Sequence, residues 1–276
     1  MSDDFLKKTQ ENNHVTGSAK DSHYARLRKA FRDKKKSQNT KEIIQIYGYH
    51  AAIAALENPH RKIHRIFLTK NSLERVNKIV KLDEQKLNIV EPKAISNMLA
   101  PDAVHQGILI ECDPLKIKKL STFKNKNLLL VLDQITDPHN VGAIMRSATA
   151  LNVSAIITTA RHSAKESATM AKSASGALEY IEYVNVQNLA EALIELKQAG
   201  YQTIGLDSEG EDILENTFCN SKIALVLGAE GKGLRQKTRA TVDNLARLDM
   251  PGKIKSLNVS NAAAISLYAA HKFLTK

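Results

Sequence analysis

The chain has 276 residues, of which 43% are hydrophobic, and a formal net charge of +11 at pH 7. This length and apolar fraction are sufficient for two packed domains. No run approaches the roughly 18 apolar residues that cross a bilayer, and the polar N-terminus lacks the apolar segment of a secretion signal, so we expect a cytoplasmic protein. Cys112 and Cys219 lack the spacings of disulfide frameworks and metal sites, so we expect no metal and two buried thiols.

The first 42 residues carry much of the positive charge. Residues 1–41 contain 11 Lys and Arg against 5 Asp and Glu, a net +6, and show no sustained apolar period. We therefore predict a disordered basic arm over residues 1–42. Nucleic acid is the favoured partner of such an arm because each neutralised phosphate releases counterions, and a solubilising tail is the alternative.

Residues 43–113 alternate between short helical and short strand patterns. Helices are predicted over 51–56, 73–82 and 94–99, and strands over 63–68, 87–90 and 107–111. Elements of these lengths in this alternation indicate a small α/β domain. The Lys-rich, weakly periodic segment 114–126 is the predicted linker that follows it.

Residues 127–276 predict a second α/β domain, with a parallel sheet. The continuous apolar run at 128–132 is typical of a strand covered on both faces. Similar runs recur at 155–158, 203–206 and 223–227, a helical stretch covers 189–199, and a further strand-like run covers 245–250. Ligands of such domains lie at the carboxyl ends of the strands, so polar residues there are candidate site residues.

The segment 133–148 follows the first of these strands. Asn140 can cap a helix whose apolar positions follow helical spacing, and Arg146 comes six residues later. Six residues correspond to about 240° around a helix, so only a long side chain could bring Arg146 back to the strand end. A capped helix with a surface arginine is the plain alternative.

The segment 225–234 runs from a strand into a loop with three glycines and Glu230. Glycine lets a backbone approach a ligand closely. The spacing matches neither a Walker loop nor GxGxxG, so by itself this loop is a weak indication of a site.

The segment 253–264 places several polar residues before an apolar helix predicted over 261–273. Four residues suit a helix N-terminus: Ser256, Asn258, Ser260 and Asn261. One cap needs only one of them, and the helix behind them is apolar on nearly all sides, which predicts a buried helix. A polar site held on a rigid element and an unusually polar cap on a core helix are equally compatible with this pattern.

Taken together, the segments 137–148, 227–234 and 250–260 strongly resemble the three ordered motifs of the SpoU (TrmH-like) branch of the SPOUT RNA methyltransferases. The resemblance covers residues 127–276. The front domain, through residues 47–50 and 105–107, is also similar to that of the large-subunit rRNA guanosine-2′-O-methyltransferases. The resemblance implies an L30e-like RNA substrate-binding domain over 43–113. It further implies a SPOUT domain over 127–276 with a C-terminal trefoil knot, an exception to the rule that chains are unknotted.

The resemblance also implies an activity: transfer of a methyl group from S-adenosylmethionine to a ribose 2′-hydroxyl in RNA, by a homodimer. The implied cofactor contacts are Gly228, Leu248 and Leu257. The implied catalytic residues are Asn140, Arg146, Glu230, Ser256 and Asn258. Among these, Arg146 would activate the hydroxyl, although an arginine is normally always protonated and helping a phosphate or a water is as plausible. Asn140 and Glu230 would position groups, and Ser256 and Asn258 would belong to the pocket.

Two other functions remain open at this point. One is 2′-O-methylation of tRNA or of another rRNA site instead of a guanosine of 23S rRNA. The other is a non-catalytic RNA-binding protein of ribosome assembly, which loss of Asn140, Arg146 or Glu230 would have favoured. All three residues are present.

Overall fold

The structure is a computed structural model that describes residues 43–276. The predicted basic arm, residues 1–42, lies outside the described residues. Residues 43–276 form one compact unit with two sheets. Within that unit, no helix is both long and apolar enough to cross a membrane.

The first sheet has four strands in the order β1-β4-β2-β3. The strands are β1 (Ile44–Tyr47), β2 (Ile63–Leu68), β3 (Leu87–Ile89) and β4 (Ile108–Cys112). β4 pairs antiparallel with β1 and β2, and β2 pairs parallel with β3. The sequence patterns predicted three of these strands and missed β1, a four-residue strand whose buried Ile44 and Ile46 alternate with half-exposed residues.

Three helices accompany this sheet: α2 (Tyr49–Glu57), α3 (Lys70–Asn77) and α4 (Pro92–Ser96). Gly48 precedes α2 with a φ of 85°, a conformation that costs glycine little because it has no Cβ. α3 begins with a capping box in which Thr69 and Ser72 each accept a hydrogen bond from the backbone of the other. α3 ends at Asn77, five residues earlier than predicted.

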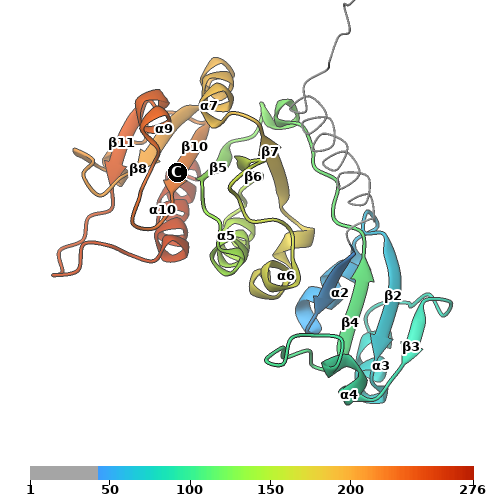
Figure 1. The fold of residues 1–276 in the computed structure, drawn as a ribbon. Helices are drawn as coiled ribbons and strands as arrows, with labels where there is room; N and C mark the ends of the chain where they lie inside the picture. The colour runs from blue at the N-terminus through green and yellow to red at the C-terminus, as the bar shows by residue number, and fades with distance from the viewer. Residues whose placement is uncertain (1–42) are drawn as a thin grey trace, which may run out of the picture. The chain divides into compact units, whose positions relative to one another are not determined.

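The second sheet has seven strands in the order β7-β6-β5-β10-β8-β11-β9, and every pair in it is parallel (Figure 1). The strands are β5 (Leu128–Asp133), β6 (Ala155–Thr159), β7 (Glu182–Val186), β8 (Gln202–Leu206), β9 (Asp212–Ile213), β10 (Ile223–Gly228) and β11 (Asn244–Arg247). The predicted parallel α/β domain is therefore confirmed. β5 is buried along its whole length, as its continuous apolar run predicted.

Helices cover both faces of this sheet. They are α5 (Pro138–Ala150), α6 (Ala168–Ala174), α7 (Leu189–Gln198), α8 (Leu214–Thr217), α9 (Gln236–Thr241) and α10 (Val259–Leu274), with short 3-10 helices at Leu120–Phe123 and Ala177–Glu179. Leu130 and Leu132 of β5 pack in the cluster that contains α5 and α10, whereas Leu129 and Val131 pack with α7. Alternate residues of a strand point to opposite faces, so α5 and α10 cover one face and α7 covers the other (Figure 1).

The helices α5 and α6 lie unusually close together at Gly142. A Cβ atom on Gly142 would come within 2.6 Å of both the Met170 carbonyl oxygen and Ser173 Cβ. Only a residue without a side chain permits this approach. The contact fixes α5, which starts at the carboxyl end of β5, and thereby fixes the residues of its first turn.

Two expectations about burial were wrong. Cys112 is buried, but Cys219 is exposed. The helix α10 is not buried on all sides, because Ile265 and Tyr268 are 46% and 57% exposed while Ala263 and Leu267 are fully buried. In the predicted linker, Leu120 and Phe123 are buried, so this segment is packed and not merely a spacer.

Candidate active site

The polar segments that follow β5 and β10 meet at the carboxyl edge of the seven-stranded sheet. β5 and β10 are neighbours, with Gly228 paired to Asp133. The segment before α10 approaches the same place, since Asn258 forms a hydrogen bond with Asn140. The structure thus brings together residues that are up to 118 positions apart in the sequence.

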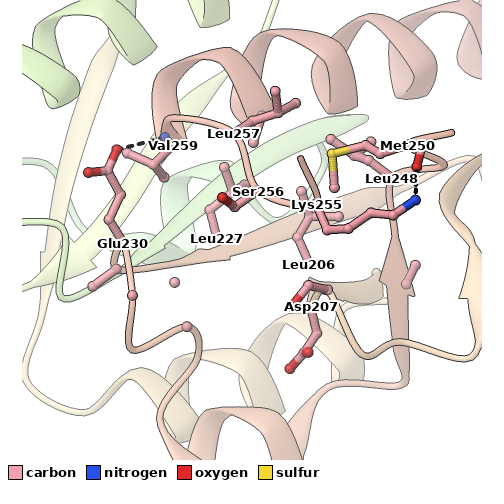
Figure 2. A pocket seen from close by; sticks show the side chains of 17 residues that line it. Leu206, Asp207, Leu227, Glu230, Leu248, Met250, Lys255, Ser256, Leu257 and Val259 are labelled. Carbon is pink, nitrogen blue, oxygen red and sulfur yellow. Dashed lines mark hydrogen bonds between the residues drawn. The ribbon is translucent and has the colours of Figure 1, made fainter. Parts of the chain in front are cut away.

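A cavity of about 360 Å³ opens at this edge, beside the glycine-rich loop (Figure 2). Its apolar wall consists of Leu206, Leu227, Ala246, Leu248, Met250, Leu257, Val259 and Ala262. Its polar lining includes Glu230 and Ser256, together with the backbone of the loop from Gly228 to Gly233. This volume lies within the range of about 300–1,000 Å³ that is typical of small-molecule sites. An apolar wall with a few polar groups is also typical of such sites.

Glu230 connects the glycine-rich loop to the start of α10. Its Oε1 accepts hydrogen bonds from Val259 N at 2.9 Å and from Asn258 Nδ2 at 2.7 Å. The same Asn258 Nδ2 also donates to Asn140 Oδ1 at 3.0 Å. Figure 2 shows Glu230 pointing toward Val259, beside the cavity. Three of the predicted site residues therefore form one hydrogen-bonded group.

The helix caps differ in part from the sequence prediction. Asn258 caps α10 by accepting from Ser260 N at 2.9 Å, so α10 begins at Val259, two residues earlier than predicted. Asn140 does not cap α5. Asp137 is the cap, accepting from His139 N, because Pro138 suits the first helical position, where no N–H is needed. Asn140 lies in the first turn, and its side chain is thereby left for the contact with Asn258.

The glycine-rich loop is folded tightly against itself. Gly233 N donates to the Ala229 carbonyl oxygen at 2.8 Å, and a Cβ atom on Gly228 would lie 2.1 Å from the Gly233 carbonyl carbon. Gly231 and Gly233 adopt φ values of 74° and 62°, in the left-handed region. All three glycines are thus required by the backbone path of the loop.

Arg146 is not among the residues that line the cavity. Its side chain is exposed and forms no hydrogen bond or ion pair within residues 43–276. Arg146 lies seven positions after His139, which places the two residues on nearly the same face of α5. On that face, His139 Nδ1 contacts Ser173 Oγ of α6 at 3.0 Å. Of the predicted catalytic residues, Glu230 and Ser256 line the cavity, and Asn140 and Asn258 are connected to Glu230 by hydrogen bonds. Arg146 does neither.

The implied cofactor residues Gly228, Leu248 and Leu257 all line the cavity. Asp207 and Ser208 also line it, and sequence reasoning missed them. They directly follow β8, so the rule that ligands lie at the carboxyl ends of parallel strands could have identified them. Across residues 43–276, no group of three His, Cys, Asp or Glu side chains has an arrangement that could hold a metal ion.

Two family profiles match this chain. The profile of the SpoU rRNA Methylase family matches residues 127–268. The profile described as RNA 2′-O ribose methyltransferase substrate binding matches residues 45–118. The first profile ends within α10 and contains all the cavity-lining residues named above.

Curated relatives cover most of the chain. The 23S rRNA (guanosine-2′-O-)-methyltransferase RlmB of Ralstonia nicotianae is 36% identical over 82% of this chain and 94% of its own length. The protein of the same name from Pseudomonas syringae pv. tomato is 35% identical over 83% of this chain and 95% of its own length.

Solved structures share the fold. The SpoU methyltransferase AviRb from Streptomyces viridochromogenes, in complex with AdoMet, gives a TM-score of 0.72 with 20% identity, covering 89% of this chain and 94% of AviRb. An AdoMet-bound rRNA methyltransferase from Sinorhizobium meliloti also gives a TM-score of 0.72, with 22% identity, 87% of this chain and 91% of that one.

Proposed function

Because this chain belongs to the SpoU rRNA methylase family, we propose that it methylates the ribose 2′-hydroxyl of a guanosine in 23S rRNA, with S-adenosylmethionine as methyl donor. The observation that carries the proposal is the hydrogen-bonded group of Asn140, Glu230 and Asn258, in which Glu230 also lines a cavity with an apolar wall. A ribose can be positioned by the polar group, and the adenosine of the cofactor suits the apolar wall.

The residues at the cavity fit this cofactor. The adenosine of S-adenosylmethionine needs apolar walls and backbone partners more than it needs charges. Leu248 and Leu257 supply apolar wall, and Gly228 and its neighbours in the glycine-rich loop also line the cavity. When bound, the cofactor supplies an electrophilic methyl group on a sulfonium sulfur.

The protein must orient the 2′-hydroxyl and help remove its proton, since an alcohol is a weak nucleophile. Asn140 uses its Oδ1 for Asn258, which leaves its Nδ2 to donate to the substrate. Glu230 uses its Oε1 for α10, which leaves its Oε2 to accept from the ribose. Ser256, exposed and lining the cavity, is placed to contact either the cofactor or the ribose.

Arg146 is the proposed activator of the hydroxyl. It is exposed and has no carboxylate partner in the described part of the chain, so it is available to the RNA. A guanidinium remains protonated in proteins, so its contribution is to hold a phosphate or to stabilise the developing alkoxide. A phosphate or a water held in this way can receive the proton.

The substrate assignment rests on the front domain and on the names of the relatives. Residues 43–113 are the proposed L30e-like RNA-binding domain, supported by the substrate-binding profile. A minimal tRNA enzyme would not need such a domain, but tRNA and other rRNA sites remain alternative substrates. The non-catalytic alternative is less well supported, because the polar group at the cavity is complete. With an rRNA substrate, the proposed location of the protein is the cytoplasm.

The proposed assembly is a homodimer with a knotted C-terminal segment. Four apolar residues near that segment are exposed: Ile254, Leu257, Ile265 and Tyr268. Exposed apolar side chains gathered on neighbouring elements are typical of an interface. The trefoil knot is expected from the family and from the approach of the segment before α10 to the glycine-rich loop.

The test is transfer of a labelled methyl group from S-adenosylmethionine to protein-free 23S rRNA, followed by mapping of the modified nucleotide. We expect a single 2′-O-methylguanosine. Arg146→Ala should lower turnover by about 100-fold or more while the affinity for the cofactor is unchanged.

The control is Lys272→Ala, which removes one exposed positive charge from the C-terminal end of α10 and should leave turnover near that of the wild type. Transfer to tRNA in place of 23S rRNA would reject the substrate and keep the chemistry. Cofactor binding without transfer to any RNA would support the non-catalytic alternative.

A further inference from the structure

Two arginines, one directly before the short helix α9 and one within it, each bind a carboxylate at the end of a parallel strand. Arg235 directly precedes the helix and Arg239 lies four positions later, with Arg239 N donating to the Arg235 carbonyl oxygen at 2.8 Å. Residues four apart lie on the same side of a helix. Their partners are Asp133, the last residue of β5, and Asp207, which directly follows β8. These two strands flank β10 in the sheet.

Arg235 holds Asp133 by two hydrogen bonds. Its backbone N donates to Asp133 Oδ2 at 3.0 Å, and its Nε donates to Asp133 Oδ1 at 2.6 Å. The Asp133 side chain is fully buried. A buried carboxylate needs such partners because leaving it unpaired is costly.

Arg239 holds Asp207 through Nη1, with Glu209 close to its Nη2 at 4.0 Å. The other oxygen of Asp207 accepts from Glu209 N at 2.9 Å. The Asp207 side chain is only 10% exposed, and each of its carboxylate oxygens accepts a hydrogen bond from the protein. Asp207 lines the cavity, and these contacts hold its side chain in the wall.

The glycine-rich loop precedes both arginines in the sequence and follows β10, the strand between β5 and β8. It leaves β10 at Gly228 and ends at Leu234, directly before Arg235. Glycine loses more conformational freedom on ordering than any other residue, so a loop with three glycines is costly to fix. The same loop carries Glu230, whose position must match Val259 and Asn258.

We propose that Arg235 and Arg239 are positioning residues that set the spacing between the two walls of the cavity before the cofactor binds. Arg235 fixes the end of the glycine-rich loop to β5, and Arg239 fixes the loop after β8 to the same helix. Neither arginine lines the cavity, so both act through the residues they hold. The proposal rests on the proposed function, since it assigns the ordered cavity to S-adenosylmethionine.

The chain offers a matched control for the ion pair itself. In the front domain, Arg65 Nε donates to Glu111 Oε2 at 2.6 Å, and the Glu111 side chain is 10% exposed. This pair resembles that of Arg235 with Asp133 in distance and in the burial of the carboxylate, but it lies on β2 and β4, away from the cavity residues. Loss of this pair should lower stability without changing cofactor affinity.

The experiment measures S-adenosylmethionine affinity by calorimetry for the full chain carrying Arg235→Met, Arg239→Met or Arg65→Met. We expect the dissociation constant to rise about tenfold or more for the two α9 variants, because binding must then order the loop, and to stay unchanged for Arg65→Met. In the absence of cofactor, hydrogen exchange of the Gly233 amide should become faster in Arg235→Met, since its bond to Ala229 loosens. Arg235→Lys should restore part of the affinity because it returns a donor to Asp133.

Steady-state kinetics separates positioning from general damage. The KM for S-adenosylmethionine should rise, while the KM for RNA stays near its wild-type value. Equal affinities in Arg235→Met, Arg239→Met and Arg65→Met would overturn the proposal, and so would unchanged exchange at Gly233. If Arg235→Met does not fold, Arg235→Lys and Arg239→Met carry the same test. If the wild-type chain fails to bind S-adenosylmethionine, that result contradicts the proposed function and is distinct from a failure of the positioning role of Arg235 and Arg239.

Discussion

The two cysteines differ in environment although the sequence treats them alike. Cys112 is fully buried in β4, with Sγ 3.6 Å from the Ile44 carbonyl oxygen, whereas Cys219 is exposed. Burial raises the pKa of the Cys112 thiol to about 12, even though the nearby Arg61 guanidinium opposes the shift. Because the thiolate is the reactive form, Cys112 should be inert in the folded protein.

We expect a thiol reagent at pH 8 to modify one cysteine per native chain, namely Cys219, and both cysteines after denaturation. Cys219→Ser should abolish the native reaction, and Cys112→Ser should leave it unchanged. Mass spectrometry of the labelled peptides identifies the site. Rapid native labelling of Cys112 would show that β4 opens readily.

The same thiol makes stability depend on alkaline pH. The unfolded pKa is about 8.5 and the folded pKa is higher, so the folded state binds the proton more tightly. This contribution is fully present below about pH 8.5 and is lost as the pH rises toward the folded pKa. The unfolding free energy of the wild type should fall over that window more steeply than that of Cys112→Ser, as urea titrations at several pH values can measure.

Sequence reasoning named some of the residues that line the cavity but not the contacts that hold them. Gly228, Leu248, Ser256 and Leu257 line the cavity as the family motifs implied. The pair Asp133 and Arg235 was out of reach, because the two residues are 102 positions apart and their meeting depends on strand order. Asn140 was wrongly assigned as a cap because Asp137, three residues earlier, is equally suited to cap a helix.

At the scale of elements, the long apolar strands were predicted well and the short ones were not. β5 and β10 are continuous apolar runs that end within a residue of the predicted bounds. β9 has two residues, and β7 has a mixed burial pattern, so neither carries a clear period. Their place in the sheet comes from pairing with neighbours, which local pattern cannot supply.

The helix α10 has one buried face and one exposed apolar face. Ala263, Leu267 and Ala270 are fully buried, while Ile265 and Tyr268 are 46% and 57% exposed. The apolar residues around α10 predicted a buried helix, and this prediction is correct for one side of the helix only. On the proposed assembly, the second side is covered by another copy of the chain.

Tyr268→Glu should dissociate the proposed homodimer, because a carboxylate would be buried without a partner at its interface. Sedimentation equilibrium at micromolar concentration should then report the monomer mass for the variant and twice that mass for the wild type. Lys272→Glu, at the C-terminal end of the same helix, is a control for added negative charge and should remain dimeric. A monomeric wild type would contradict the assembly.

At the scale of the whole described unit, one buried cation joins the segment after α2 to the region around α6. The Arg61 side chain is fully buried and forms ion pairs with Glu166 and Glu179, both at 2.5 Å. Burial alone lowers the pKa of the guanidinium, but the hydrogen bond to Glu179 and the charges of Glu166 and Glu179 outweigh burial and raise the pKa above its ordinary value. The cation also donates to the Asp113 carbonyl oxygen at 3.0 Å.

Arg61→Met should lower the unfolding free energy by about 3–5 kcal/mol, because it leaves two carboxylates with little solvent and no cation. Glu179 is only 2% exposed in the folded protein. The neighbouring Lys62 is a matched control: it is 63% exposed and lies 3.8 Å from Asp113, so Lys62→Met should cost about 0–1 kcal/mol. Urea denaturation of both variants measures the difference, and equal losses would show that Arg61 contributes no more than a surface pair.

The pairing of β1 with β4 has a consequence for how such a chain can change. Ile44, in the first strand of the front sheet, faces Cys112, in the last, so the polypeptide enters and leaves this sheet at one place. A segment whose ends adjoin can be exchanged as a cassette without rerouting the rest of the chain. A graft of this kind would have to bring an equivalent of Arg61 with it, or the catalytic portion would keep two buried carboxylates without their cation.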